Sequence, residues 1–296
     1  TNADATLTTN LATEVAARTA ADLLKENTAN KSTNVVLDGA SDVTSVATIP
    51  EEQTAIAEFW NRKPGVIAGI PVVCAVLELC GVTDYEIKKN DGETTPANSL
   101  LLTARGKTQS LLLAERSALN FFGRLSGIAT LTKSWVDTVA DTKVAIRDTR
   151  KTTPGLRELE KYAVRMGGGE NHRFSLSDAA LIKDNHVLAA GGVASAFNLV
   201  KKKFPNLPLE VEVDSLQQLR EVIEAGADLV MLDNMSIEEC RAAVEIVAGR
   251  AKLEASGGLI LNNAHAYAKT GVDYLAVGAL THSAPVLDIG LDLRME

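Results

Sequence analysis

The chain has 296 residues, 46% of them apolar, so it can bury a large core in one or two domains. A formal net charge of -8 and an isoelectric point near 5.2 argue against a nucleic-acid-binding protein. Cys74, Cys80 and Cys240 have neither CxxC nor metal-ligand spacing, so we expect no zinc site or disulfide framework, and a reducing, cytoplasmic location.

A membrane-bound protein is not expected either. The longest apolar run, residues 65–80, is interrupted by Pro71 and Glu78 and is too short to span a bilayer. The N-terminus is polar and rich in threonine, unlike a signal peptide. We therefore expect no membrane partner.

The first part of the chain predicts a separate layer that mixes helices and strands. In chain order, its elements are a helix over 11–25, a strand over 55–60, a helix starting near Pro71, a strand over 85–89 that turns at Asp91-Gly92, and a long helix over 107–123.

From residue 144 onward, strands alternate with helices. The expected strands cover residues 144–146, 179–183, 209–213, 229–232, 252–255 and 274–277, and the helices between them cover 154–166, 193–203, 216–225, 237–247 and 264–269. Thr153 and Pro154 are expected to start the first of these helices. The alternation predicts a parallel sheet with right-handed crossovers. Six strands are fewer than eight, so a barrel would be incomplete, and an open sheet is also compatible.

The strand over 144–146 leads into a strongly cationic stretch. After Arg147, its cationic and imidazole side chains are Arg150, Lys151, Arg157, Lys161, Arg165, His172 and Arg173. A solvated helix face explains the three in the middle. Arg150, Lys151 and Lys183 instead follow apolar strands, where an unpaired cation is costly. Because α/β folds place chemistry at strand ends, we predict a site for a strongly anionic ligand.

Acidic side chains follow the other strands of the predicted sheet. Glu210, Glu212 and Asp214 share one face of their strand, and Asp233 and Glu254 lie at the ends of the next two. Acids on an inward face need cations, a metal or a polar substrate. The alternative is an outward, solvated face, which helices around a barrel would disfavour.

Glycine-containing loops follow the last two strands, at Ser256-Gly257-Gly258 and at Gly278-Ala279-Leu280. Glycine lets backbone N–H groups approach an anion closely, and barrels of this kind commonly bind phosphate in their final loops. Ordinary turns use glycine at strand ends as well. We predict phosphate contacts at Ser256, Gly257, Gly258, Gly278 and Ala279.

Six segments, in this order and spacing, resemble the quinolinate phosphoribosyltransferase family. They are ERSALNFFGRLSGIAT from Glu115, RDTRKTTPGLRELEKYAVRMGGGENHR from Arg147, LIKDNH from Leu181, VEVD from Val211, ADLVMLDN from Ala227 and LEASGG from Leu253. The resemblance begins near Asp42, and its long segment is highly specific. The chain departs from the family at residues 41–45, where a Gly-Asp pair is usual; this concerns local backbone geometry, because no proposed substrate contact lies there.

The resemblance implies an N-terminal α/β sandwich domain, placed at residues 1–117, and an incomplete (β/α) barrel with phosphate-binding loops, placed at 118–296. It implies phosphoribosyl transfer from 5-phosphoribosyl 1-pyrophosphate (PRPP) to quinolinate with decarboxylation, giving nicotinate mononucleotide, pyrophosphate and carbon dioxide for NAD biosynthesis. It also implies Mg²⁺ bound with PRPP. The expected assembly is a homodimer, or a larger oligomer built from dimers, with shared active sites.

Site roles follow from the same resemblance. Quinolinate is held by Arg150, His172, Arg173 and Lys183, with Arg116 reaching in from the partner subunit. Catalysis involves Lys151 at phosphoryl oxygens, and Glu212 and Asp233 at the ribose or the metal. Three alternatives remain at this point: a transferase for nicotinate or another carboxylated heterocycle, a catalytically silent phosphate-binding barrel, and a purely structural protein. A catalytically silent barrel would not require Arg116, Arg150 and His172, and this chain has all three.

Overall fold

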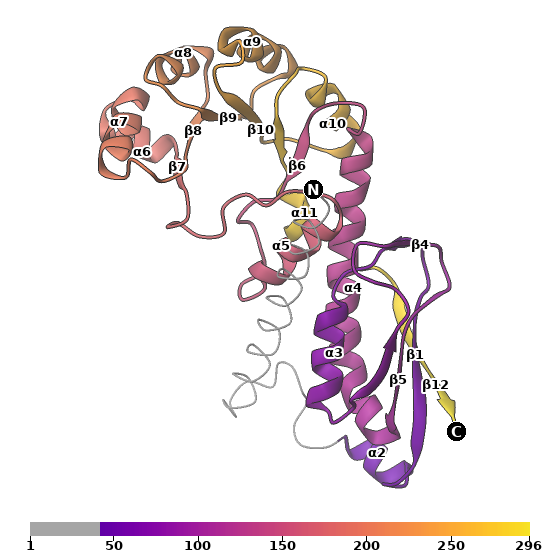
Figure 1. The fold of residues 1–296 in the computed structure, drawn as a ribbon. Coiled ribbons are helices and arrows are strands. Elements are labelled where there is room, and N and C mark those ends of the chain that lie inside the picture. The colour runs from indigo at the N-terminus through magenta and orange to yellow at the C-terminus, as the bar shows by residue number, and fades with distance from the viewer. Residues whose placement is uncertain (1–41) are drawn as a thin grey trace. The chain divides into compact units, whose positions relative to one another are not determined.

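A computed structural model describes residues 42–296, so the predicted helix over 11–25 and Ser41 lie outside the described residues. The chain forms two compact units, each built from separated stretches (Figure 1). The described part of the first unit comprises residues 42–131, 154–168 and 284–296, and the second comprises 132–153 and 169–283. The domain boundary predicted between residues 117 and 118 stays a prediction. Both residues lie within one continuous helix, Thr108–Thr138.

The first unit contains a four-stranded antiparallel sheet in the order β12-β1-β5-β3. Its strands are β1 (Thr54–Asn61), β3 (Asp84–Ile87), β5 (Ser99–Lys107) and β12 (Ile289–Met295). Alternate residues of β1, Ala55, Ala57 and Phe59, are fully buried, as the period of two in a strand requires. A two-stranded sheet of β2 (Gly65–Val66) and β4 (Thr94–Thr95) accompanies it.

Helices complete the first unit. They are α2 (Val43–Thr48), α3 (Ile70–Leu79), the part of α4 (Thr108–Thr138) up to residue 131, and α5 (Arg157–Met166). The N-terminus of α3 is capped from a distance, because the Asp91 carboxylate accepts the N–H groups of Gly69 at 2.8 Å and Ile70 at 3.0 Å. One hydrophobic core joins α3, α4 and the large sheet, and it includes Phe59, Leu77 and Phe122.

Gly127 in α4 permits a close approach of the C-terminal segment. A Cβ atom added there would lie 2.0 Å from the Pro285 carbonyl oxygen. Gly127→Ala is therefore expected to destabilise the protein by about 2–4 kcal/mol, because helix and segment must separate. Thermal unfolding measures this, with Asn120→Ala on the exposed face of α4 as control. Equal unfolding midpoints for Gly127→Ala and wild type would show that the segment does not pack here.

The second unit is a six-stranded parallel sheet in the order β6-β11-β10-β9-β8-β7. Its strands are β6 (Ala145–Arg147), β7 (Ala180–Ile182), β8 (Leu209–Val213), β9 (Leu229–Asp233), β10 (Lys252–Ser256) and β11 (Tyr274–Ala276). β6 and β7 are not paired with each other, so the barrel is incomplete. The predicted fold class is confirmed.

Helices lie along the outer side of this curved sheet (Figure 1). They are α6 (Asp184–Ala190), α7 (Val193–Lys203), α8 (Leu216–Glu224), α9 (Ile237–Val247) and α10 (Leu261–Ala268). The short α11 (Ala279–His282) follows β11. The predicted bounds of α7 and α9 are confirmed. Helix α6 was not predicted; it has only seven residues, too few to show helical periodicity, and none of them is buried.

Two predictions for α5 are wrong. The helix starts at Arg157 rather than at Thr153-Pro154, because Gly155 has a φ of +78° and so turns the chain before the helix. Lys161 was assigned to a solvated face, yet it is fully buried, as is Glu160. Arg124 donates to the Glu160 carboxylate at 2.7 Å. The charged residues in the middle of α5 thus belong to the interior.

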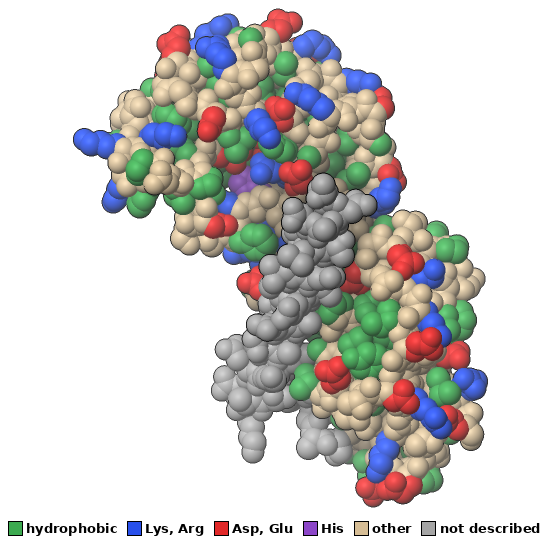
Figure 2. Space-filling view, in the orientation of Figure 1, with side chains coloured by type: hydrophobic (Ala, Val, Ile, Leu, Met, Phe, Trp, Pro, Cys, Tyr) green, Lys and Arg blue, Asp and Glu red, His purple; other side chains and the backbone are tan. Residues whose placement is uncertain are grey.

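No helix among residues 42–296 is both long and apolar enough to cross a membrane. On the visible face of these residues, Lys and Arg side chains are interspersed with Asp and Glu (Figure 2).

Candidate active site

A cavity of about 560 Å³ lies in the second unit, at the carboxyl ends of the parallel strands. Ten of the predicted site residues line it: Arg150, Lys151, His172, Arg173, Lys183, Glu212, Asp233, Ser256, Gly257 and Gly258. They come from the ends of β6 to β10 and from the loop after α5. These predicted residues thus lie together at the carboxyl ends of the strands, and their roles remain a proposal.

Two arginines in this cavity have donors without a partner. The Nε atoms of Arg150 and Arg173 are buried and make no hydrogen bond. Burial, and next the positive charge of Arg150, lower the pKa of the Arg173 guanidinium. Two like charges with unused donors lower their free energy when an anion binds between them. The arrangement suits a ligand with more than one carboxylate or phosphate group.

Carboxylates line another part of the same cavity. Glu212 forms an ion pair with Lys183, and Asp233 accepts a hydrogen bond from the Asn234 amide at 2.9 Å. Both carboxylates also line an adjoining cavity of about 320 Å³, together with Asp184 and Asp214. The site therefore joins a cationic region to an acidic one, as an anionic substrate accompanied by a cation requires.

The loop after β10 needs glycine at position 257. Gly257 has a φ of +89°, and a Cβ there would lie 2.1 Å from the side-chain oxygen of Asn234. Gly278 and Ala279 are not among the lining residues. A Cβ on Gly278 would lie 3.0 Å from Cδ of Lys151, and Thr281 donates to the Lys151 carbonyl oxygen at 2.7 Å. The loop after β11 thus packs against Lys151.

Arg116 belongs to α4 in the first unit, and its side chain is 72% exposed. Its guanidinium lies 3.8 Å from the carboxylate of the neighbouring Glu115. It is not among the residues that line the cavity. Its predicted role in a partner's site remains a proposal.

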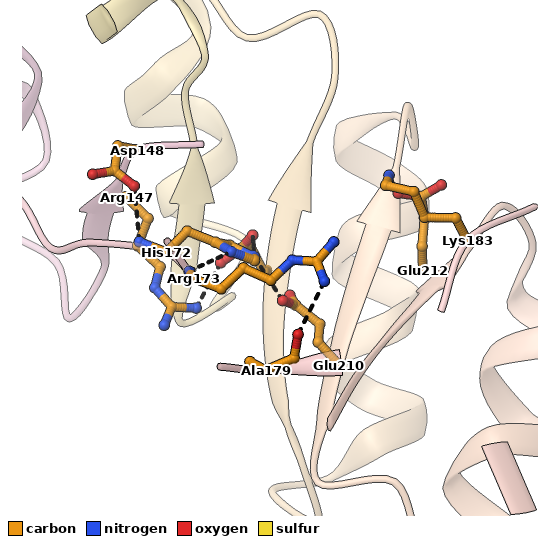
Figure 3. Close-up of polar contacts among 9 residues, drawn as sticks. Arg147, Asp148, His172, Arg173, Ala179, Lys183, Glu210 and Glu212 are labelled. Carbon is orange, nitrogen blue, oxygen red and sulfur yellow. Dashed lines mark hydrogen bonds and ion pairs between the residues drawn. The ribbon is translucent and has the colours of Figure 1, made fainter. Parts of the chain in front are cut away.

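Next to the cavity, the buried His172, Glu210 and Glu254 form a polar layer with the half-buried Arg147. Figure 3 shows Arg147, His172 and Glu210 of this layer. His172 Nε2 lies 2.7 Å from Glu210 and 3.5 Å from Glu254, and Arg147 donates to Glu254 at 2.8 Å. The Arg147 guanidinium also stacks on the Tyr274 ring, 4.1 Å from its centre. No role was predicted for Arg147 from the sequence. The feature that could have indicated one is a charged side chain within a short strand.

Two family models together match nearly all of the described residues. Residues 42–126 match the model for the N-terminal domain of quinolinate phosphoribosyl transferase, and residues 128–292 match the model for its C-terminal domain. The chain belongs to the quinolinate phosphoribosyltransferase family. The predicted family is confirmed.

Individual members of the family are similar over most of their length. The nicotinate-nucleotide pyrophosphorylase [carboxylating] of Mycobacterium leprae is 52% identical over 85% of this chain and 91% of its own. Quinolinate phosphoribosyltransferase [decarboxylating] 1b of Nicotiana tabacum is 39% identical, over 86% of this chain and 78% of its own. The solved nicotinate-nucleotide pyrophosphorylase of Francisella tularensis has a TM-score of 0.87 and 38% identity, over 94% and 97% of the two chains.

The buried layer of this family member makes its stability depend on pH. Burial, and next the charge of Glu210, raise the pKa of Glu254 to about 7 from an ordinary value of 4.5. Between these values the folded chain keeps a proton that the unfolded chain has lost. Stability therefore falls as pH rises through this window, by up to roughly 3 kcal/mol.

Thermal unfolding from pH 5 to pH 8 measures this contribution in wild type and Glu254→Gln. The glutamine still accepts from Arg147 but cannot ionise. The unfolding midpoint of Glu254→Gln should therefore rise relative to that of wild type as pH increases. Asp178→Asn is the control: although partial burial favours the neutral acid, backbone N–H groups hold the pKa of Asp178 at about 2, below this range. Parallel curves for wild type and Glu254→Gln would contradict the expectation.

Proposed function

We propose that this chain transfers the phosphoribosyl group of PRPP to the ring nitrogen of quinolinate, releasing pyrophosphate and carbon dioxide and yielding nicotinate mononucleotide for NAD biosynthesis. Family membership supports the reaction. The observation that carries the site assignment is the cavity itself, which combines arginines that have unpartnered donors with carboxylates on neighbouring strands.

Quinolinate binds to the cationic region. Its two carboxylates match the forked donors of Arg150 and Arg173, and Lys183 adds a third cation in the same cavity. Bound in this way, the dianion neutralises two guanidiniums that otherwise repel each other. The binding energy orients the ring nitrogen toward the ribose carbon that it attacks.

PRPP occupies the remainder of the cavity. Lys151 and the backbone of Ser256–Gly258 contact its phosphoryl oxygens. When the bond from the ribose to pyrophosphate breaks, positive charge develops on the sugar, and the carboxylates of Glu212 and Asp233 stabilise that charge. After transfer, the 2-carboxylate leaves as carbon dioxide. The electron pair of the broken bond stays at C2, where the cationic pyridine ring stabilises it, and C2 then takes a proton from water. No protein nucleophile is required.

The residues of the acidic region fit Mg²⁺. Glu212 and Asp233 present carboxylate oxygens at the cavity, and magnesium prefers a few such ligands together with substrate oxygens and water. These two residues would hold the ion, which would offset the negative charge of the pyrophosphate group when PRPP is bound. Lys183, paired with Glu212, keeps that carboxylate neutralised until then.

The active unit is a homodimer in which Arg116 of each subunit completes the other subunit's site. The exposure of its side chain in a single chain supports this arrangement, because the guanidinium, with a long ion pair of 3.8 Å to Glu115, can still reach an external ligand. The three cysteines, Cys74, Cys80 and Cys240, are free thiols, which supports a reducing, cytoplasmic setting.

One assay tests the reaction. The protein is incubated with PRPP, Mg²⁺ and quinolinate carrying labelled carbon in the 2-carboxylate, and both nicotinate mononucleotide and released carbon dioxide are measured. Equal amounts of the two products are expected. A matched reaction with nicotinate in place of quinolinate should give no nucleotide. Nucleotide formed from nicotinate, with none from quinolinate, would overturn the proposal in favour of a nicotinate transferase.

A further inference from the structure

The hydrogen bonds of His172 determine which of its ring nitrogens carries hydrogen. The backbone N–H of Arg173 donates to Nδ1 at 2.8 Å, and because a backbone amide can only donate, Nδ1 must be an acceptor without hydrogen. The hydrogen of the neutral ring is then on Nε2. That nitrogen lies 2.7 Å from Oε2 of Glu210 and donates to it.

Both ring nitrogens of His172 are therefore used inside the protein. The side chain is only 8% exposed, and the ring meets the cavity without a free nitrogen. Its backbone is also held, since the His172 N–H donates to the buried Asp148 carboxylate at 2.9 Å. This leaves the imidazole poorly suited to bind a quinolinate carboxylate through nitrogen and well suited to hold its neighbour.

Arg173 is that neighbour, and it is anchored at two points. Its backbone N–H is bound to His172, and its guanidinium Nη1 donates to the Ala179 carbonyl oxygen at 3.0 Å. Figure 3 shows His172 and Arg173 between Arg147 and Asp148 on one side and Glu210 and Ala179 on the other, with Lys183 and Glu212 further along the sheet. Arg173 Nε remains buried without a partner.

We propose that Glu210 is a positioning residue for quinolinate binding: it holds the His172 ring by accepting from Nε2, and Nδ1 of that ring holds the backbone of Arg173. The inference rests on the proposed function, in which Arg173 binds a substrate carboxylate. Arg147 and Glu254 support the layer from the other side. Arg147 pairs with the Glu254 carboxylate, while His172 donates to the Glu210 carboxylate. Loss of the Glu210 acceptor should therefore weaken the binding of quinolinate and change the binding of PRPP little.

A metal ion is the competing occupant of this layer. One ligand atom each from His172, Glu210 and Glu254 lie within 4.8 Å of one another. A cation there would need the Nε2 lone pair, but that nitrogen carries the hydrogen, and Arg147 already pairs with Glu254. Metal analysis of the purified enzyme distinguishes the two, because an ion bound in the layer would be retained in wild type and lost in Glu210→Gln.

Steady-state kinetics with each substrate varied in turn test the proposal in Glu210→Gln and Glu210→Leu. The amide oxygen of glutamine still accepts from Nε2, so Glu210→Gln should keep the KM for quinolinate within about threefold of wild type. Leucine leaves a buried N–H unpaired, and Glu210→Leu should raise that KM roughly tenfold or more. The KM for PRPP should change little. A folding defect would instead lower the active fraction without changing either KM.

His172→Phe provides an independent variant that retains the ring but no nitrogen. It should raise the quinolinate KM as Glu210→Leu does, and the double variant should add little further loss because both act through one chain of contacts. An unchanged quinolinate KM in Glu210→Leu or in His172→Phe would overturn the proposal, as would additive losses, or Glu210→Gln being as impaired as Glu210→Leu. Absence of quinolinate turnover by wild type would instead overturn the proposed function.

Discussion

Arg150→Ala is expected to raise the KM for quinolinate by about a hundredfold or more, the effect of losing one partner of a desolvated, charge-assisted pair. The residue lines the cavity, and its Nε has no hydrogen-bond partner among residues 42–296. Arg150→Lys keeps the charge without the forked donors and should be intermediate. Initial rates at saturating PRPP provide the measurement.

Arg241→Ala is the matched control for this experiment. Arg241 lies on the exposed surface of α9, in the same unit as Arg150 and away from the cavity, so its replacement should leave both KM values unchanged. An unaltered quinolinate KM in Arg150→Ala would remove Arg150 from the carboxylate site. The proposed division of labour between Arg150 and Arg173 would then have to be abandoned.

Mixing two inactive variants should restore activity if the sites are shared between subunits. Arg116→Ala removes the residue supplied to the partner, whereas Lys151→Ala damages the cavity of its own chain. After random exchange, half of the dimers contain one chain of each kind, and one of their two sites is intact. The mixture should therefore reach about a quarter of wild-type activity.

Arg150→Ala mixed with Lys151→Ala controls for non-specific rescue. Both residues line the cavity of one chain, so every site in the mixed dimer carries a defect and activity should stay at the level of the separate variants. Subunit exchange is verified with differently tagged chains. Verified exchange without recovered activity for Arg116→Ala and Lys151→Ala would contradict the shared site.

Local pattern was sufficient for much of the second unit. Short strand-like runs of three to five residues followed by amphipathic stretches predicted all six parallel strands, and α7 and α9 to their end residues. These elements are short-range features, because each strand contains buried apolar residues and both α7 and α9 have one apolar stripe. Strand direction then brought the charged residues after each strand to one edge, where the cavity lies.

Long-range pairing was not predictable in the same way. Strands β5 and β12 were missed, although β12 pairs with β1 over residues 289–295. Its alternating Ile289, Leu291 and Leu293 become a strand only when a partner from the beginning of the chain covers them. Lys161 was misplaced for a related reason, since helical spacing shows which residues share a face but not how much of the helix is covered.

By itself, the sequence determined the order of the six parallel strands, the family and the residue types at the strand ends, because these depend on local periodicity and on short motifs. Tertiary structure alone decided which charges meet. Glu210 and Glu212 share a strand face, yet Glu210 binds His172 in the interior whereas Glu212 pairs with Lys183 at the cavity. That difference comes from strand register and burial, which only the folded sheet establishes.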